Sequence, residues 1–325
     1  MPTPPNLGQV VANAWVAYVG GQPEDNIFED YWMFDQFSKG QGFKSFDGGL
    51  SINGGIDYAL NTTVSSYTDT DTISTTRIDV FDEYSFPWKE YAGNVVMSYL
   101  EEAKNQGSGR KFDLLEGKLE NLRTTLQKVL NDGMLSDGTG NNGKDIGGVQ
   151  LLIAANPTVG TPGGINRGTF SFWRNQQVAG TKSTTAFDNL RAAMRSCYNL
   201  CGSGVDATHP SFALTDRPTF EGYEGLLTAN ERYTEKTKGD AGFKNEALLF
   251  KDIQIAYDKS TAFLAGSVYF MNTKYLKLGY QSGFWMKGRP AVSPANQTIE
   301  VFTVMTICNL FTSNPRRLGV VTAVN

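Results

Sequence analysis

The segment Gly138–Asp145, GTGNNGKD, comes nearest to a motif that could do chemistry in this chain. Gly138, Gly143 and Lys144 match a phosphate-binding loop, but Asp145 stands where that loop needs a Ser or Thr hydroxyl to hold magnesium. A carboxylate at this position would repel phosphate, and the segment follows a predicted long helix where the motif follows a strand. The residues therefore favour a flexible Gly/Asn loop over a nucleotide site.

The same loop fails as a calcium site. Counted from Asp137, its sixth position is Asn142, where a glycine is needed, and its twelfth is Gly148, where a bidentate Glu is needed. Asp69 and Asp71 are interpreted as solvated turn residues. We expect neither a metal nor a cofactor.

Residues for nucleophilic or acid–base catalysis are also few. His209 is the one histidine, so a Ser–His or Cys–His pair would depend entirely on it, and no GxSxG sequence occurs. Cys197 and Cys201 are four apart on a predicted helix, which is more typical of two small core residues than of a zinc site. No catalytic residue is assigned, and the chain is predicted not to be an enzyme.

Composition limits the remaining classes of protein. The 325 residues favour two or more linked subdomains, and 40% hydrophobic residues suffice for a real core. A net charge of -4 and a pI near 5.2 argue against a dedicated nucleic-acid binder. Three cysteines, an odd number, favour a reduced compartment. There is neither a secretory signal nor an apolar run of membrane-spanning length, so we expect no membrane contact.

A long β-hairpin is predicted over residues 48–87. Two alternating runs rich in Thr, Ser, Tyr and Ile are separated by Thr68–Asp71, and each arm has about 16 residues, or roughly 50 Å at ~3.3 Å per residue. Such a hairpin is too long to be buried by its own domain and is only marginally stable alone. We therefore expect it to lie on a neighbouring molecule.

The other elements read as follows. Residues 1–47 are predicted to be an aromatic-rich arm, which either lies on another part of an assembly or is tucked onto the chain's own core. Residues 88–106 read as a strand entering a short helix, and about 109–133 as an amphipathic helix with one apolar face. A further helix is predicted over about 184–201, with a capping box at Thr185 and Asp188, and another helix after Asp216. A half-buried strand is predicted at 253–257, and two long closing strands are predicted on either side of a break at Asn314–Pro315. The apolar face of the long helix comprises Phe112, Leu115, Leu119, Leu122, Leu126 and Val129.

Several strings in this order resemble the major capsid proteins of tailed bacteriophages, which share the Hong Kong 97-type fold with encapsulins. They are FPWKEYAG at 86–93, IGGVQLLIAANPTVGTPGGINRGTFSFWRNQ at 146–176, and LLFKDIQIAYD with GSVYFMNTKYLKL at 248–278. The resemblance spans nearly the whole chain, and Gly163–Gln176 is its most specific part. It implies an α+β capsid fold.

The resemblance also implies a division of the chain. Residues 1–47 would be the N-terminal arm and 48–87 the extended loop lying over the adjacent subunit. Residues 88–137 and 291–325 would form the peripheral domain, with its spine helix at about 109–133, and 138–290 the axial domain that meets its copies at capsomer centres. The implied function is a structural head protein that self-assembles into hexamers and pentamers of an icosahedral shell around double-stranded DNA.

The expected partners follow from that function. They are other copies of the chain, packaged DNA held by weak non-specific contact, and portal, scaffolding or decoration proteins. The expected location is the virion, assembled in the cytoplasm of a bacterial host. On the hairpin, Tyr67 and Arg77 should touch a neighbouring subunit because so long an element cannot be buried within one chain. The full set of expected interface residues is Asn61, Tyr67, Arg77, Trp88, Arg174, Arg316 and Arg317.

Two departures from related shells are expected. Some shells of this type are cross-linked between Lys and Asn, but residues 48–87 contain no Lys, so we predict a non-covalent shell at this loop. Because Met1 runs directly into the arm, we also expect no long cleaved N-terminal scaffold. Two alternatives stay open: an encapsulin-like compartment, and a monomeric, strand-rich carbohydrate-binding protein.

Overall fold

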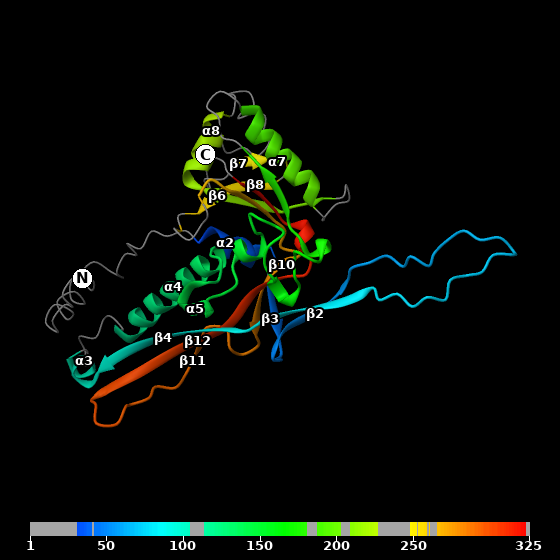
Figure 1. The fold of residues 1–325 in the computed structure, drawn as a ribbon. Coiled ribbons are helices and arrows are strands. Elements are labelled where there is room, and N and C mark those ends of the chain that lie inside the picture. Colours follow the sequence, from blue (N-terminus) through cyan, green and yellow to red (C-terminus); the bar gives the residue numbers. More distant parts are fainter. Residues whose placement is uncertain are drawn as a thin grey trace.

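The structure is a computed structural model that describes residues 31–40, 42–104, 114–180, 187–202, 209–226, 248–251, 253–258, 260 and 265–322. It is built around three sheets with helices packed against two of them, and a hairpin projects away from the rest (Figure 1). This mixture of helices and strands is the α+β class predicted from the sequence. The expected capping box at Thr185 and Asp188, Phe112, and residues 1–30 of the arm lie outside the described residues or side chains.

A five-stranded sheet forms the elongated part of the molecule. β4 (Lys89–Ser98) pairs antiparallel with β12 (Ile299–Thr312) along its whole length, from Lys89 opposite Cys308 to Ser98 opposite Ile299. β1 (Phe43–Phe46) and β10 (Leu276–Gln281) extend the sheet on one side of β12, and β11 (Lys287–Gly288) pairs with β12 as well. The length of β12 follows from the run of β-branched residues in 299–312, which favour a strand.

Two helices pack beside this sheet, α3 (Tyr99–Lys104) and α4 (Leu114–Leu135). α4 lies so close to β4 that a Cβ built on Gly93 would stand 2.5 Å from Cδ1 of Leu122. The helix buries Leu126 and Leu130, whereas Val129 is 42% exposed. The prediction that Val129 faces inward is therefore wrong, because a period of 3.6 residues rotates a three-and-four pattern off the contact line by the end of a long helix.

A six-stranded sheet forms the second part, in the order β5-β13-β9-β6-β8-β7. Its strands are β5 (Gln176–Ala179), β6 (Phe212–Asp216), β7 (Leu248–Phe250), β8 (Ile253–Asp258), β9 (Val268–Met271) and β13 (Gly319–Thr322). α7 (Phe187–Cys201) and α8 (Arg217–Leu226) share one apolar cluster with it, at the end of the molecule opposite the β4–β12 ribbon (Figure 1). The prediction that Cys197 and Cys201 are small core residues is confirmed: both are buried on α7, together with Leu190 and Met194.

Strand pairing crosses the domain boundaries expected from the sequence. β13, placed with the peripheral part, lies between β5 and β9 in the six-stranded sheet. β10 and β11, placed with the axial part, pair with β12. The second closing strand has four described residues where a long strand was expected, although the break at Asn314–Pro315 is present as a 3-10 turn, η3 (Pro315–Arg317). The expected boundaries stay a proposal.

The aromatic stretch of the expected arm is packed on the chain's own core. α2 (Trp32–Lys39) buries Met33 and Phe37 completely. Phe34 stacks on Trp285 at 6.2 Å, and Trp32 meets Phe212 edge-on at 5.5 Å. For residues 31–37, the alternative of a segment tucked onto its own core is therefore the right one.

The hairpin is paired over a shorter length than expected. β2 (Ser51–Asp57) and β3 (Phe81–Pro87) form seven pairs, from Ser51 opposite Pro87 to Asp57 opposite Phe81. Beyond them the chain continues outward to the tip without a regular ladder, so the prediction of two strands of about 16 residues is wrong. The paired part is the part whose side chains reach the core: Ile52, Tyr84 and Phe86 are buried. The outer part has no such surface to pack on.

Candidate assembly surfaces

The hairpin exposes apolar side chains from its root to its tip. Six large ones along residues 48–87 have exposed fractions between 61% and 97%: Leu50, Leu60, Val64, Tyr67, Ile73 and Phe81. Isolated exposed apolar residues are ordinary on a protein surface, but a series of them on a projecting element marks a contact surface. The hairpin in Figure 1 has no neighbouring element of the described chain along its outer part.

Three of the expected interface residues lie on this outer hairpin. Tyr67 is 62% exposed. Arg77 is fully open to solvent apart from a 3.7 Å ion pair with Asp79, which is itself exposed and so contributes little. The Asn61 side chain forms a local turn: its Oδ1 accepts hydrogen bonds from the Thr63 N–H at 2.9 Å and from the Thr63 hydroxyl at 2.7 Å.

The tip of the hairpin is the turn expected at Thr68–Asp71. The Asp71 N–H donates to the Thr68 carbonyl at 2.9 Å, and the Thr68 N–H donates to the Asp71 carboxylate at 2.9 Å. Backbone and hydroxyl hydrogen bonds from Thr68 lower the pKa of Asp71. The carboxylate therefore closes a turn, as the sequence predicts for Asp71.

The root of the hairpin is fixed by aromatic contacts. Trp88 packs against Phe46 at 5.8 Å, and its indole N–H donates to the Gly49 carbonyl at 2.9 Å. Tyr84 stacks on Trp173 at 5.9 Å, and Tyr58 stacks on Phe172 at 5.0 Å. Trp88, one of the expected interface residues, is half-buried against its own chain at the hairpin root, and its place at an interface stays a prediction.

Phe172 and Trp173 belong to a loop that a buried arginine holds together. Arg167 is 1% exposed. Its guanidinium donates to the Leu151 carbonyl at 3.0 Å, to the Trp173 carbonyl at 3.4 Å, and to the Leu152 carbonyl. Burial lowers its pKa to about 10, which leaves it cationic at neutral pH. Sequence reasoning missed Arg167, although it lies within the most specific segment of the resemblance, and no sequence signal separates it from Arg174.

The other three expected interface residues lie near this loop. Arg174 donates to the carbonyls of Arg167 at 2.6 Å and Gly168 at 2.7 Å, and Arg317 donates to the Cys201 carbonyl at 3.2 Å. Arg316 is exposed, and its carbonyl accepts from the Gln176 side chain at 3.3 Å. Within the described part of the chain, none of these three has a carboxylate at ion-pair distance. They form a group separate from the outer hairpin residues, with uncompensated positive charge.

A second apolar surface lies at the far end of the β4–β12 ribbon. This peripheral tip consists of Val96, Tyr99, Leu100 and Val292, with exposed fractions from 43% to 63%. Val301 is opposite Val96 in the ladder and opposite Val292 in an isolated bridge, so the three valines lie in a row.

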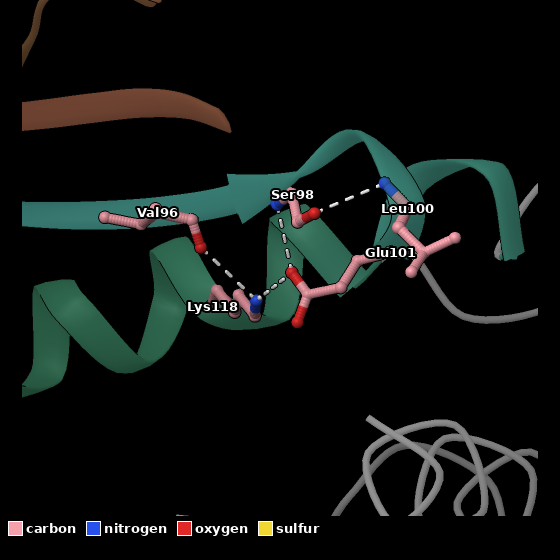
Figure 2. A network of polar contacts seen from close by, with 5 residues as sticks. All are labelled: Val96, Ser98, Leu100, Glu101 and Lys118. Carbon is pink, nitrogen blue, oxygen red and sulfur yellow. Dashed lines mark hydrogen bonds and ion pairs between the residues drawn. The ribbon is translucent and has the colours of Figure 1, made fainter. Parts of the chain in front are cut away.

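A polar network holds the peripheral tip in place (Figure 2). The Ser98 hydroxyl accepts from the Leu100 N–H at 3.3 Å, and the Glu101 carboxylate accepts from the Ser98 N–H at 3.2 Å, which is a capping box for α3. Lys118 on α4 donates to Glu101 at 3.1 Å and to the Val96 carbonyl at 3.4 Å. The S-x-x-E sequence at 98–101 is a signal that could have revealed this cap.

Polar groups of the loop at 137–148 form hydrogen bonds within the loop itself. Asp137 accepts from the Thr139 N–H at 3.0 Å and its hydroxyl at 2.7 Å, and these hydrogen bonds lower the pKa of Asp137. Asn141 and Asn142 adopt the left-handed conformation, with φ of 49° and 57°. Across the described ranges no group of three or more His, Cys, Asp or Glu residues could hold a metal ion.

The described helices include none with the length and apolar character needed to cross a membrane.

Solved capsid structures share this architecture. The protein of the cyanophage A-1(L) capsid aligns with a TM-score of 0.65 and 14% identity over 93% of this chain and 95% of that chain. That of the native GTA particle capsid aligns with a TM-score of 0.66 and 11% identity over 94% of each chain. The holo-SrpI encapsulin complex from Synechococcus elongatus PCC 7942 aligns with a TM-score of 0.56 and 11% identity over 93% of this chain and 90% of that chain. The chain thus has the Hong Kong 97-type α+β capsid fold expected from its sequence. Comparisons with protein-family models and with curated proteins gave no match.

Proposed function

We propose that this chain is the major capsid protein of a tailed bacteriophage, which assembles with copies of itself into hexamers and pentamers of an icosahedral shell around double-stranded DNA. The observation that carries the proposal is the projecting hairpin, whose six large apolar side chains have no covering surface within the described chain. The fold shared with capsid proteins of the cyanophage A-1(L) and of the GTA particle supports a second copy as the covering partner.

The energetic argument favours assembly. Burying one exposed large apolar side chain contributes ~1.5–3 kcal/mol, so six of them would contribute about 9–18 kcal/mol per subunit. Part of this is offset by the lost freedom of the subunit and of the hairpin. A repeating shell makes the same contact at each subunit, so even a modest net gain per contact holds a closed particle together.

Each part of the chain then has a role. The hairpin lies over the adjacent subunit, α4 is the spine of the peripheral domain, and residues 138–290 meet their copies near the capsomer centre. The uncompensated charges of Arg174, Arg316 and Arg317 face a neighbouring subunit or make weak, non-specific contact with packaged DNA. The protein acts without an active site, is assembled in the cytoplasm of the bacterial host and resides in the virion. Portal, scaffolding or decoration proteins are further partners.

Electron microscopy and size-exclusion chromatography of the purified full chain test this proposal. Closed particles, or capsomers that close into particles at higher concentration, are the expected result. A stable 35.6 kDa monomer that never assembles would overturn it and would favour the carbohydrate-binding alternative.

An encapsulin-like compartment is the second candidate, because the holo-SrpI encapsulin complex has the same fold. The content of particles purified from a producing host separates the two. Nuclease-resistant double-stranded DNA supports the phage capsid, whereas enclosed protein cargo without DNA supports the compartment.

A further inference from the structure

The imidazole of His209 packs across the end of α7, just before the chain enters β6. Its ring is parallel to the ring of Tyr198, with the centroids 4.6 Å apart and 7° between the planes. A Cβ built on Gly202 would stand 1.9 Å from Cε1 and Nδ1 of His209 and 2.6 Å from Cγ, so Gly202 lies over the face of the imidazole. Tyr198 and Gly202 are four residues apart on one side of the helix end, and the imidazole covers both.

This packed position suits a neutral imidazole. The Nδ1 atom of His209 is buried and has no hydrogen-bond partner in the part of the chain that the structure describes. A neutral imidazole carries one proton, which belongs on Nε2 here because on Nδ1 it would be a buried N–H without an acceptor. A second proton has to go to Nδ1 and creates that unpaired N–H. The packed position therefore excludes the imidazolium ion.

The ring that stacks on His209 is already in contact with a cation. The Lys251 ammonium lies over the Tyr198 ring, 4.1 Å from its centroid, and donates to the Asn199 side chain at 2.8 Å. Burial and, next, the charge of Arg195 lower the pKa of Lys251. Protonation of His209 would bring a second positive charge against the same aromatic ring.

The charged side chains that the described residues bring to this position are three cations. Arg195 comes from α7 and Lys251 from the turn between β7 and β8, and Arg317 from η3 donates to the Cys201 carbonyl at 3.2 Å, next to Gly202. Within the described ranges none of the three forms an ion pair with a carboxylate. An imidazolium ion here would be repelled without an anion to offset the repulsion.

We infer that His209 is a pH-sensitive latch, whose ring holds the end of α7 through Tyr198 and Gly202 only while the imidazole is neutral. A histidine side chain ordinarily takes up a proton at about pH 6.5, so the latch is closed at neutral pH and opens as the pH falls through that range. The main chain stays anchored, because the Asn272 side chain donates to the His209 carbonyl at 2.6 Å. Opening therefore swings the imidazole into water and uncovers the buried Tyr198 ring. The latch is a property of the subunit and is independent of the proposed function.

Hydrogen exchange of the full chain on either side of this range, at about pH 7.5 and about pH 5.5, tests the inference. After correction for the intrinsic pH dependence of exchange, the amides of 195–202 and 209–214 should lose about tenfold of their protection in acid. His209→Phe keeps a flat ring for Tyr198 but has no nitrogen to protonate, so its protection should be the same at both pH values. An unchanged wild type, or an equal loss in His209→Phe, would overturn the inference.

Gly202→Ala opens the latch without a change of pH. Gly202 is not in the left-handed conformation, so alanine adds only a methyl group, which stands where the imidazole packs. At neutral pH this variant should show the exchange that wild type shows only in acid, and acid should change it little further. Ser196→Ala, at an exposed position of the same helix, is the control and should behave as wild type. Wild-type protection in Gly202→Ala at neutral pH would contradict the latch.

The wild-type chain alone provides a direct test, because His209 is its one histidine. Isotope-labelled histidine then gives a single imidazole signal in NMR. Contacts of the imidazole protons with protons of Tyr198 and Gly202 should be present at neutral pH and disappear when the signal moves to its protonated position. Contacts that persist with a protonated imidazole would overturn the inference.

Discussion

The ring of Tyr84 lies directly against the backbone of Gly54, its partner on the facing strand of the hairpin root. A Cβ built on Gly54 would stand 2.3 Å from the Tyr84 hydroxyl oxygen, whereas one built on the next residue, Gly55, would meet nothing within 4 Å. Tyr84 in turn stacks on Trp173, so this close approach connects the hairpin to the core.

Gly54→Ala should therefore displace Tyr84 and destabilise the root by ~1–3 kcal/mol. Thermal or denaturant unfolding of the subunit measures this loss, and the yield of particles should fall with it. Gly55→Ala in the same strand is the control and should change stability by less than about 0.5 kcal/mol. Equal effects of the two substitutions would show that the ring does not require a glycine at position 54.

A charge on the outer hairpin should block assembly without unfolding the subunit. Val64 is 82% exposed, so Val64→Asp should change the free energy of unfolding by less than about 0.5 kcal/mol. In an apolar contact the same carboxylate would have to lose its water, so closed particles should disappear from electron micrographs. Val64→Thr keeps the β-branched shape without the charge and should still assemble. Normal particles from the Asp variant would remove Val64 from the contact.

An element of this fold was predictable from the sequence where local residue patterns determine its contacts, and was not predictable where its contacts depend on segments distant in sequence. The inward face of α7 was predictable because residues such as Leu190 and Met194 meet a core within the chain. The paired length of the hairpin was not predictable. An alternation of polar and apolar residues indicates strand propensity, but it does not show whether a partner strand is in register. The place of β13 depends on contacts with strands distant in sequence. Arg167 was missed because its three acceptors are backbone carbonyls, which no side-chain pattern encodes.

The Lys118–Glu101 ion pair should stabilise the peripheral tip in a pH-dependent way. Burial raises the pKa of Glu101, but the hydrogen bonds from Lys118 and the Ser98 N–H and the charge of Lys118 outweigh it, so the pKa is lowered overall from its ordinary 4.5. A lowered pKa means that this stabilisation is fully present above pH 4.5 and is lost as the pH falls through the lower folded value. Lys118→Met should therefore cost about 1 kcal/mol at neutral pH and less in acid.

Unfolding of wild type and Lys118→Met across the acid range measures that difference. Arg123→Met is the matched control on the same helix, because Arg123 and Glu120 are 3.7 Å apart and mostly exposed. Its cost should stay below about 0.5 kcal/mol at every pH. A cost of Lys118→Met that does not shrink in acid would assign the role of Lys118 to its packing and its bond to the Val96 carbonyl.

The shell should carry no covalent cross-link through the hairpin, because residues 48–87 contain no Lys to donate an amine. Purified particles boiled in detergent should run on a denaturing gel at the size of one subunit. A ladder of multimers that resists boiling and reductant would contradict this and would require a lysine from elsewhere in the chain.

Arg167 should be the most sensitive of the arginines near the hairpin root. Arg167→Met keeps much of the side-chain volume but leaves the carbonyls of Leu151, Leu152 and Trp173 without their donor in a buried site, so we expect a loss of ~2–4 kcal/mol. Arg167→Lys should recover little of it, since one ammonium group cannot match the planar fork that reaches all three carbonyls.

Arg174→Met is the control: Arg174 is only half-buried, so its carbonyl partners can turn to water, and the loss should be near 1 kcal/mol. Denaturant unfolding of the three variants gives these values. If Arg167→Met unfolds too readily to measure, hydrogen exchange of residues 150–175 in Arg167→Lys decides the matter: faster exchange there supports the role of Arg167, and unchanged exchange contradicts it.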